Sequence, residues 1–316
     1  MARLLVTGGA GFIGSALVRR ILATSDDTVR VLDALTYAGG RDNLEEVVGE
    51  RCELVVGDVR DRAAVAAALV GCDAVLHLAA ESHVDRSIVD PDAFVSTNCD
   101  GTNVVCDEAR RAGVERVVHV STDEVYGSVT EGWATEDWPL RPSSPYSASK
   151  AGSDLIALSY HHTFGLDVVV TRGSNTYGPR QYPEKVIPLF VSRLLRGETV
   201  PLYGDGSNQR EWLHVDDHAD GILAVLRGAE PGSVVNVGGG VHLTNREITD
   251  RLVALCDADP ALVTPVADRL GHDLRYAIDA GRLRSLGWSP HFELDEGLAA
   301  TVDWYRANTA WWERRR

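Results

Sequence analysis

The sequence predicts an α/β protein whose main part is a doubly wound parallel sheet, followed by a smaller mixed α/β C-terminal lobe. Three observations carry this prediction. Short apolar runs of strand length alternate with helical stretches, a glycine cluster directly follows the first run, and an acidic residue closes the second. Alternation of this kind is typical of a parallel sheet covered by helices on both faces.

The first element is an apolar run at 4–7, which is expected to form a buried parallel strand. A glycine-rich turn and a helical stretch at 15–24 follow it. Gly9, Gly11 and Gly14 fit the pattern G-x-G-x-x-G, in which glycine permits a tight turn, close approach of a pyrophosphate and close helix–strand packing. The N-terminus of the helix would then face the phosphates of a dinucleotide.

The second strand, at 29–32, ends at Asp33, which lies 19 residues after Gly14. A carboxylate there can bind both ribose hydroxyls and would repel a 2′-phosphate, so it favours NAD over NADP. A glycine-rich turn in some other α/β protein is the alternative. The strand, the helix and Asp33 all lie at the positions that a dinucleotide-binding unit requires, which argues against this alternative.

The alternation continues along the first half of the chain. Strands are expected at 53–56, 74–78, 117–120 and 167–171, and helices near 60–70, 91–112 and 145–163. Ligands of such sheets bind at the carboxyl ends of the strands. The polar clusters that follow the strands, at 57–59, 79–83 and 121–127, are therefore the candidate site segments.

Composition narrows the class of partner. The chain of 316 residues has a formal net charge of −15, which argues against nucleic acid or an anionic membrane as a partner. No signal peptide is expected, and no apolar stretch approaches the roughly 20 residues of a membrane span. Five cysteines without a C-x-x-C pair are expected to be reduced residues of a cytoplasmic protein. No spacing of His, Cys and Asp suggests a metal site.

Lysine is scarce: there are two lysines, Lys150 and Lys185, among 31 basic residues. Lys150 closes the string Tyr146-Ser147-Ala148-Ser149-Lys150, which on a helix puts the phenol and the ammonium on one face. A cation beside a phenol lowers the pKa of that phenol and can make it a general base. The alternative is a surface tyrosine and a surface lysine that happen to lie four residues apart. The scarcity of lysine favours the functional interpretation, because arginine was available and was not used.

The glycines of Gly8-x-x-Gly11-x-x-Gly14 together with Tyr146-x-x-x-Lys150 resemble the extended short-chain dehydrogenase/reductase superfamily. Over nearly its whole length the chain is similar to the dTDP-glucose 4,6-dehydratase family. The matching strings are 35–39 (LTYAG), 79–87 (AAESHVDRS), 121–127 (STDEVYG), 144–150 (SPYSASK), 182–185 (YPEK), 202–213 (LYGDGSNQREWL) and 271–276 (GHDLRY). The resemblance implies an NAD-binding Rossmann domain at 1–172 and a lobe at 173–316 that mainly binds the nucleotide sugar. About 209–240 would return to the Rossmann domain.

The resemblance also implies a reaction in deoxysugar biosynthesis, the conversion of dTDP-glucose to dTDP-4-keto-6-deoxyglucose. Sugar C4 is oxidised, water is eliminated across C5–C6, and the hydride returns to C6. Tyr146 would be the base at the C4 hydroxyl, Lys150 would also bind the nicotinamide ribose, and Thr122 would bind the sugar near C4. Glu124 would take the C5 proton and Asp123 would protonate the departing hydroxyl. Neighbouring carboxyls with opposite tasks need separated pKa values. A solvated acidic turn is the alternative for this pair.

The same resemblance supplies the expected contacts. The cofactor residues are Gly8, Gly11, Phe12, Ile13, Gly14, Asp33, Asp58, Val59, Ala79, Ala80, Thr97, Tyr146, Lys150 and Thr176. The substrate residues are Ser82, Thr122, Asn175, Lys185, Tyr203, Arg210, Asn245, Arg269 and His272. Tyr203 would stack on the base, and Arg210 would clamp the diphosphate with its planar guanidinium.

Two positions depart from the family pattern. Thr176 stands where most of these dehydratases have the second residue of an Asn-Asn pair, and Arg180 stands where they have an aromatic residue. Arg180 is typical of epimerase and decarboxylase relatives, so a nucleotide-sugar 4-epimerase or decarboxylase is the alternative on the same scaffold. Epimerases usually lack the Asp123-Glu124 pair.

A non-catalytic sensor of NAD or a nucleotide sugar is the alternative from another class of protein. A sensor does not need the catalytic groups, so the presence of all four together argues against it: Tyr146, Lys150, Asp123 and Glu124. A homodimer is expected, in which the helices near 91–112 and 145–163 pack against their symmetry mates, because a two-fold interface is the commonest way for a soluble oligomer to close.

Overall fold

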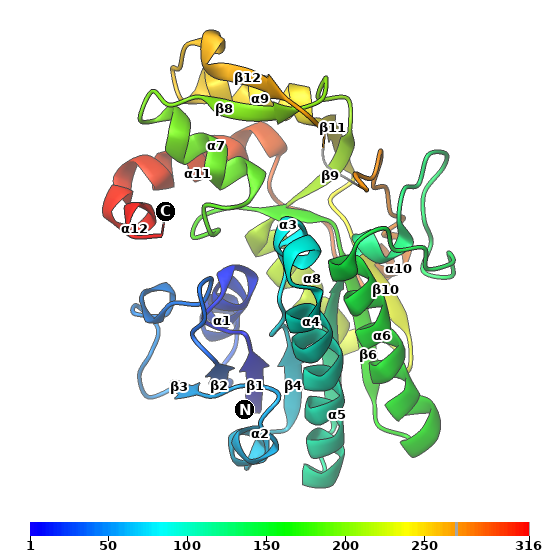
Figure 1. Cartoon of the computed structure of the whole chain (residues 1–316). Coiled ribbons are helices and arrows are strands. Elements are labelled where there is room, and N and C mark those ends of the chain that lie inside the picture. Colours follow the sequence, from blue (N-terminus) through cyan, green and yellow to red (C-terminus); the bar gives the residue numbers. More distant parts are fainter. Residues whose placement is uncertain (269–270, 316) are drawn as a thin grey trace.

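A seven-stranded parallel sheet forms the centre of the larger lobe. The computed structural model describes residues 1–268 and 271–315 (Figure 1). The strands follow the order β10-β6-β5-β4-β1-β2-β3. Their bounds are β1 Arg3–Thr7, β2 Thr28–Asp33, β3 Cys52–Val56, β4 Ala74–His77, β5 Arg116–Thr122, β6 Val168–Gly173 and β10 Val234–Val237. The chain winds outward from β1 in one direction and from β4 in the other, which makes the crevice between these two strands the expected ligand site. The predicted doubly wound Rossmann fold is confirmed.

Helices cover both faces of this sheet. The two largest apolar clusters lie between the sheet and these helices, one on each face. One face carries α1 (Phe12–Thr24) and α8 (Val215–Gly228), and the other carries α2 (Arg62–Leu69), α5 (Gly101–Ala112) and α6 (Pro145–Phe164). The first helix begins three residues earlier than the apolar pattern indicated, directly after the glycine turn at Gly11.

The helix predicted near 91–112 contains a π-helical segment. Short α4 (Pro91–Phe94) continues into a π-helix at Val95–Asp100 and then into α5. Buried Asn98 lies in the π-helix, where its side chain accepts a hydrogen bond from Glu81 N (2.9 Å) and donates to Glu81 O (3.1 Å) and Ser149 Oγ (2.8 Å). Such segments are frequent at functional sites. This one connects the candidate segment 79–83 to the helix that carries Tyr146.

The second lobe lies beyond the carboxyl ends of the large sheet (Figure 1). It contains a three-stranded sheet of β7 (Asn175–Tyr177), β9 (Gln209–His214) and β11 (Val241–Thr244), and a two-stranded sheet of β8 (Val200–Tyr203) and β12 (Val263–Val266). Its helices are α7 (Val186–Leu194), α9 (Asn245–Leu255), α11 (Leu294–Ala307) and α12 (Thr309–Glu313). An apolar core that includes Tyr177, Trp212, Trp311 and Trp312 holds these elements together.

The chain passes between the two lobes more than once. It returns to the large sheet with α8 and with β10, which pairs with β6. The segment expected to return was about 209–240, but β9 at its start belongs to the second lobe, where it pairs with β7 and β11. The remaining short elements are α3 (Val84–Val89), α10 (Gly281–Ser285), η1 (Arg41–Asn43), η3 (Asp123–Tyr126) and η4 (Pro260–Leu262). All five cysteines are free thiols. Within the described ranges, no helix combines the length and the apolar character that crossing a bilayer requires.

Candidate active site

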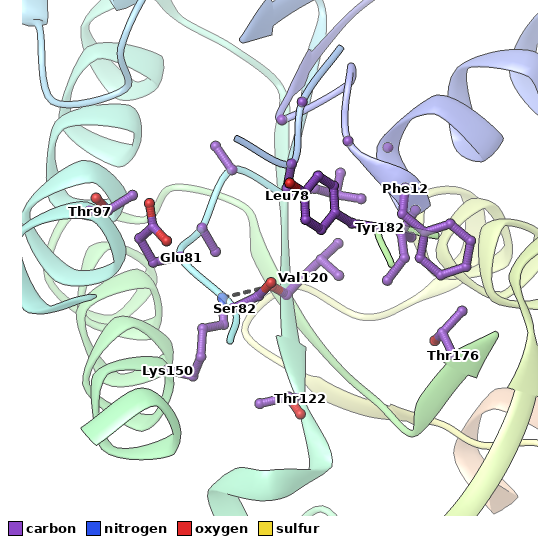
Figure 2. Close-up of a pocket in the computed structure, with 18 of the residues that line it drawn as sticks. Phe12, Leu78, Glu81, Ser82, Thr97, Val120, Thr122, Lys150, Thr176 and Tyr182 are labelled. Atoms are coloured by element: carbon purple, nitrogen blue, oxygen red, sulfur yellow. Dashed lines mark hydrogen bonds between the residues drawn. The ribbon is translucent and has the colours of Figure 1, made fainter. Parts of the chain in front are cut away.

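A cavity of about 330 Å³ opens at the carboxyl ends of the parallel strands, and part of its lining comes from the second lobe. Every residue expected to bind the cofactor and every expected catalytic residue lines it, as do Ser82, Asn175 and Lys185. Figure 2 shows side chains from the start of α1, from β5, from α6 and from the second lobe around this cavity. The structure therefore brings the expected catalytic and cofactor residues into one place.

The glycine turn is packed too tightly for a side chain at Gly8 or at Gly14. Gly8 has φ +69°, and a Cβ there would lie 2.7 Å from Ala79 N. A Cβ at Gly14 would lie 2.2 Å from Gly8 O. Gly11 precedes α1 without a side-chain cap, so no side chain covers the first N–H groups of the helix. This cradle fits the pyrophosphate of a dinucleotide.

Asp33 lies at the end of β2 with its carboxylate fixed by the backbone. Its two oxygens accept hydrogen bonds from Ala10 N (2.9 Å) and Leu35 N (2.8 Å). Burial raises the pKa of Asp33, and these two hydrogen bonds oppose that shift. The carboxylate lies beside the glycine turn, as a ribose ligand must.

Helix α6 places Tyr146 and Lys150 on the cavity wall. Ser144 and Ser147 form a reciprocal capping box that begins this helix (3.1 and 3.0 Å), and Pro145 occupies its first turn. Lys150 is 4% exposed and donates from Nζ to Val120 O at 2.9 Å, the contact drawn in Figure 2. Burial lowers the pKa of Lys150 to about 8, and Asp154 is the main group that opposes this shift.

The expected depression of the Tyr146 pKa is wrong. Burial of the phenol raises the pKa of Tyr146, and the neighbouring charge of Glu124 raises it further, while a hydrogen bond with Thr122 opposes both. The ammonium of Lys150 is held by the Val120 carbonyl and does not offset the burial. Spacing correctly placed the two residues on one helix face but could not show how deeply the phenol is buried.

The two neighbouring carboxyls occupy different environments. Strand β5 ends at Thr122, whose Oγ1 accepts a hydrogen bond from Glu124 N (3.3 Å) and donates to Asp123 Oδ1 (3.3 Å). Asp123 is 2% exposed, whereas Glu124 is half-buried. Burial and then the charge of Glu124 raise the pKa of Asp123 well above its usual range, with Arg210 opposing. One carboxyl can therefore hold a proton beside a more exposed partner.

Four further expected substrate residues lie in the second lobe, outside the cavity lining: Tyr203, Arg210, Asn245 and His272. Tyr203 meets His272 edge to face at 6.0 Å, and the turn after Tyr203 is bonded to the start of α9, where Asn245 lies. Arg210 is buried, donates to the carbonyls of Gln209 (2.7 Å) and Asp273 (2.9 Å), and lies 4.2 Å from the Tyr276 ring. Arg269 lies outside the described residues.

The two departures from the family pattern have different surroundings. Thr176 lines the cavity, and its hydroxyl lies 2.7 Å from His218 Nδ1. Burial lowers the pKa of His218 to about 4, so this imidazole is neutral at neutral pH. Arg180 has φ +67°, pairs with Glu46 at 3.0 Å and has its guanidinium 5.6 Å from the centre of the Trp304 ring. It does not line the cavity, although its neighbour Gln181 does.

Sequence reasoning missed a contact between the two lobes at the cavity mouth. Tyr37 donates to Glu184 (3.1 Å) and meets the Tyr182 ring edge to face at 5.3 Å, while the Arg86 guanidinium lies 3.7 Å above the Tyr37 ring. Tyr182 and Glu184 line the cavity. All four residues belong to the strings 35–39, 79–87 and 182–185, which match the family pattern. Nothing in the sequence near these strings shows that they contact one another in the fold.

The parallel sheet, the glycine cradle and the buried Tyr-x-x-x-Lys helix define a short-chain dehydrogenase/reductase of the extended type. A family model described as GDP-mannose 4,6 dehydratase matches residues 5–301. The dTDP-glucose 4,6-dehydratase of Streptomyces griseus is 55% identical over 315 residues, covering 98% of this chain and 96% of that protein. That of Streptomyces antibioticus is 53% identical, covering 98% and 94%.

Solved structures of this class have the same fold as this chain. DesIV, a dTDP-glucose 4,6-dehydratase from Streptomyces venezuelae solved with NAD bound, has a TM-score of 0.98 and 56% identity, covering 99% of this chain and all of that one. UDP-glucose 4-epimerase from Thermus thermophilus has a TM-score of 0.90 and 36% identity, covering 97% and 99%. The chain belongs to the dTDP-glucose 4,6-dehydratase family, and its cofactor is NAD.

Proposed function

We propose that the protein converts dTDP-glucose to dTDP-4-keto-6-deoxyglucose, with NAD regenerated in each turnover, as a step of deoxysugar biosynthesis. The observation that carries this proposal is the Asp123-Glu124 pair, one carboxyl buried and one half-buried, in the same cavity as Tyr146 and Lys150. Oxidation and reduction alone need no such pair. Elimination of water needs an acid and a base.

The first half-reaction is assigned to Tyr146, Lys150 and Thr122. The phenol of Tyr146 takes the proton of the C4 hydroxyl, and Thr122 holds the sugar beside it. Bound NAD supplies the hydride acceptor and donor chemistry. Because burial raises the pKa of Tyr146, the phenolate needs positive charge nearby, and Lys150 lies one helical turn away to supply it. Lys150 can also donate to the nicotinamide ribose.

The elimination is assigned to the carboxyl pair. The C4 ketone acidifies the C5 proton, and Glu124 removes it. Asp123, whose raised pKa favours the protonated form, gives its proton to the C6 hydroxyl as water departs. The raised pKa is the property that a general acid needs at neutral pH.

We also propose that residues 1–172 bind NAD and that 173–316 mainly hold the nucleotide sugar. Ser82, Asn175 and Lys185 would contact the sugar and its diphosphate from the cavity wall, where Lys185 Nζ donates to Ser82 O (2.5 Å). The bound base would lie farther into the second lobe, near the residues that surround Tyr203. Arg210 would reach the diphosphate with the guanidinium N–H groups that its two carbonyl bonds leave over.

Incubation with dTDP-glucose is expected to yield a product lighter by one water, with no net NADH. Deuterium at C4 of the substrate should reappear at C6 of the same molecule, because the hydride stays in one active site between its two transfers. Mass spectrometry measures both results. Loss of the label to solvent or steady accumulation of NADH would contradict the closed cycle, and a product of unchanged mass would favour the epimerase alternative.

We propose that the protein is a cytoplasmic homodimer closed by the outer faces of α4–α6. Exposed apolar residues gather on these elements: Val95 is 50% exposed, Leu155 60% and Phe164 55%. Light scattering at micromolar concentration is expected to give twice the chain mass of 34.2 kDa. Leu155→Glu should shift the species toward a monomer, whereas Val70→Glu, at a 68% exposed site directly after α2, should not. A monomeric parent protein would contradict the proposal.

A further inference from the structure

The C-terminal helix of the second lobe is hydrogen-bonded to the NAD-binding turn through one buried side chain, Asn43. This residue ends η1, in the connection that follows β2 and its Asp33. It is 2% exposed. Figure 1 shows α12 and the C-terminus beside this part of the larger lobe, which is drawn in blue.

The nitrogen and the oxygen of the Asn43 side-chain amide both form hydrogen bonds. Its Nδ2 donates to Ala10 O at 2.8 Å, and its Oδ1 accepts from Trp311 Nε1 at 3.1 Å. The orientation of the amide is fixed, because a carbonyl can only accept and an indole N–H can only donate. Asn43 thus joins two groups that lie in different lobes.

Ala10 is the central residue of the glycine turn. Its carbonyl accepts a second hydrogen bond from Gly40 N (3.1 Å), and its own N–H donates to Asp33 Oδ2 (2.9 Å). A continuous chain of hydrogen bonds therefore leads from Trp311 through Asn43 and Ala10 to Asp33. Its last two members shape the pyrophosphate cradle and the ribose site.

An ion pair between Arg315 and Asp42 lies at the edge of this contact between α12 and the larger lobe. Arg315 donates to Asp42 Oδ1 (2.5 Å) and to Trp311 O (2.7 Å), and its guanidinium lies 3.9 Å from the Trp311 ring. A Cβ at Gly40 would lie 2.7 Å from Arg315 Nη2, so the connection fits closely around this side chain. The ion pair therefore lies beside the buried hydrogen bond between Asn43 and Trp311, because Asp42 adjoins Asn43 in the chain and Arg315 contacts the Trp311 ring.

We propose that Asn43 and Trp311 are positioning residues for NAD: the second lobe, through α12, holds the glycine turn and Asp33 in the geometry that binds the dinucleotide. The physical reason is preorganisation. A turn already held in its bound geometry loses less conformational freedom when the ligand binds, so the ligand is held more tightly. The inference rests on NAD as the cofactor and not on which sugar reacts.

The test compares two neighbouring tryptophans. Trp311→Phe keeps an aromatic ring in the core but removes the N–H that Asn43 accepts. Trp312→Phe is the matched control, because Trp312 Nε1 donates to Tyr305 O (2.8 Å) inside its own lobe. Holoprotein carrying labelled NAD is mixed with excess unlabelled NAD, and the rate of label release is measured without any nucleotide sugar. Hydrogen exchange of the segment 8–14 is measured in parallel.

Trp311→Phe is expected to release NAD about tenfold faster than the parent, an effect of the size produced by one lost buried hydrogen bond, and to speed exchange in 8–14. Trp312→Phe is expected to lower the unfolding temperature similarly and to leave both readouts unchanged. Equal release from both variants, or parent-like release from Trp311→Phe, would overturn the proposal. If Trp311→Phe does not fold, Arg315→Ala tests the same contact from its rim, with faster NAD release supporting the inference and unchanged release refuting it.

Discussion

Replacing Lys150 by arginine is expected to slow sugar oxidation by about three orders of magnitude, within the 10²–10⁴-fold range of general acid–base groups. Lys150 is 4% exposed, and its ammonium lies 2.9 Å from the Val120 carbonyl, so the site fits a compact cation. A guanidinium is larger, planar and permanently charged. It cannot occupy this buried position beside the Val120 carbonyl without moving α6 or β5.

Three companion measurements make this result specific. Lys150→Met removes the charge at nearly constant length and should be as slow as Lys150→Arg, which would show that charge and shape are both required. Lys185→Arg should raise KM about tenfold with a smaller effect on kcat, because the role proposed for Lys185 is binding of the nucleotide sugar. Thermal unfolding should report folded protein in every case. A Lys150→Arg variant with near-native kcat/KM would show that the scarcity of lysine carried no information about this site.

The parts of the site that follow from local spacing could be predicted from the sequence. The glycine turn, Asp33 at the end of the second strand and the Tyr146–Lys150 pair each depend on a few neighbouring residues whose backbone geometry is almost fixed. Parallel strands bring their carboxyl ends to one edge, so the order of elements was enough to gather these groups around one cavity. The structure places all of them there.

The parts that depend on burial or on distant partners could not be predicted. The raised pKa of Tyr146 comes from depth and from Glu124, which no spacing reveals. Trp311 and Asn43 are 268 residues apart, and Tyr37 and Glu184 are 147 apart. The Arg210 guanidinium, which is expected to bind a diphosphate, also donates two hydrogen bonds to backbone carbonyls of its own lobe, and the sequence showed no sign of them. Contacts of these kinds are decided by how the lobes pack.

The protonation of Asp123 and Glu124 leads to the second large expected effect. Asp123→Asn and Glu124→Gln should each slow elimination by roughly 10²–10⁴, as expected for a general acid and a general base. Both changes keep the side-chain size and leave Tyr146, Lys150 and Thr122 in place. The first hydride transfer should therefore survive, and NADH should accumulate transiently in rapid mixing, measured by its absorbance. The matched control is Tyr146→Phe, which should lose NADH formation itself.

The pH dependence separates the two carboxyls. Burial and the charge of Glu124 raise the pKa of Asp123, so the acid form persists above the usual carboxyl range and is lost as the pH rises through the shifted value. Elimination by the parent protein should fall on that basic side, because the departing hydroxyl loses its proton donor. Asp123→Asn cannot titrate and should lack this limb, whereas Glu124→Gln should keep it. If either variant loses the first hydride transfer as severely as Tyr146→Phe does, or if Glu124→Gln rather than Asp123→Asn lacks the basic limb, the assignment of acid and base to these two residues is wrong.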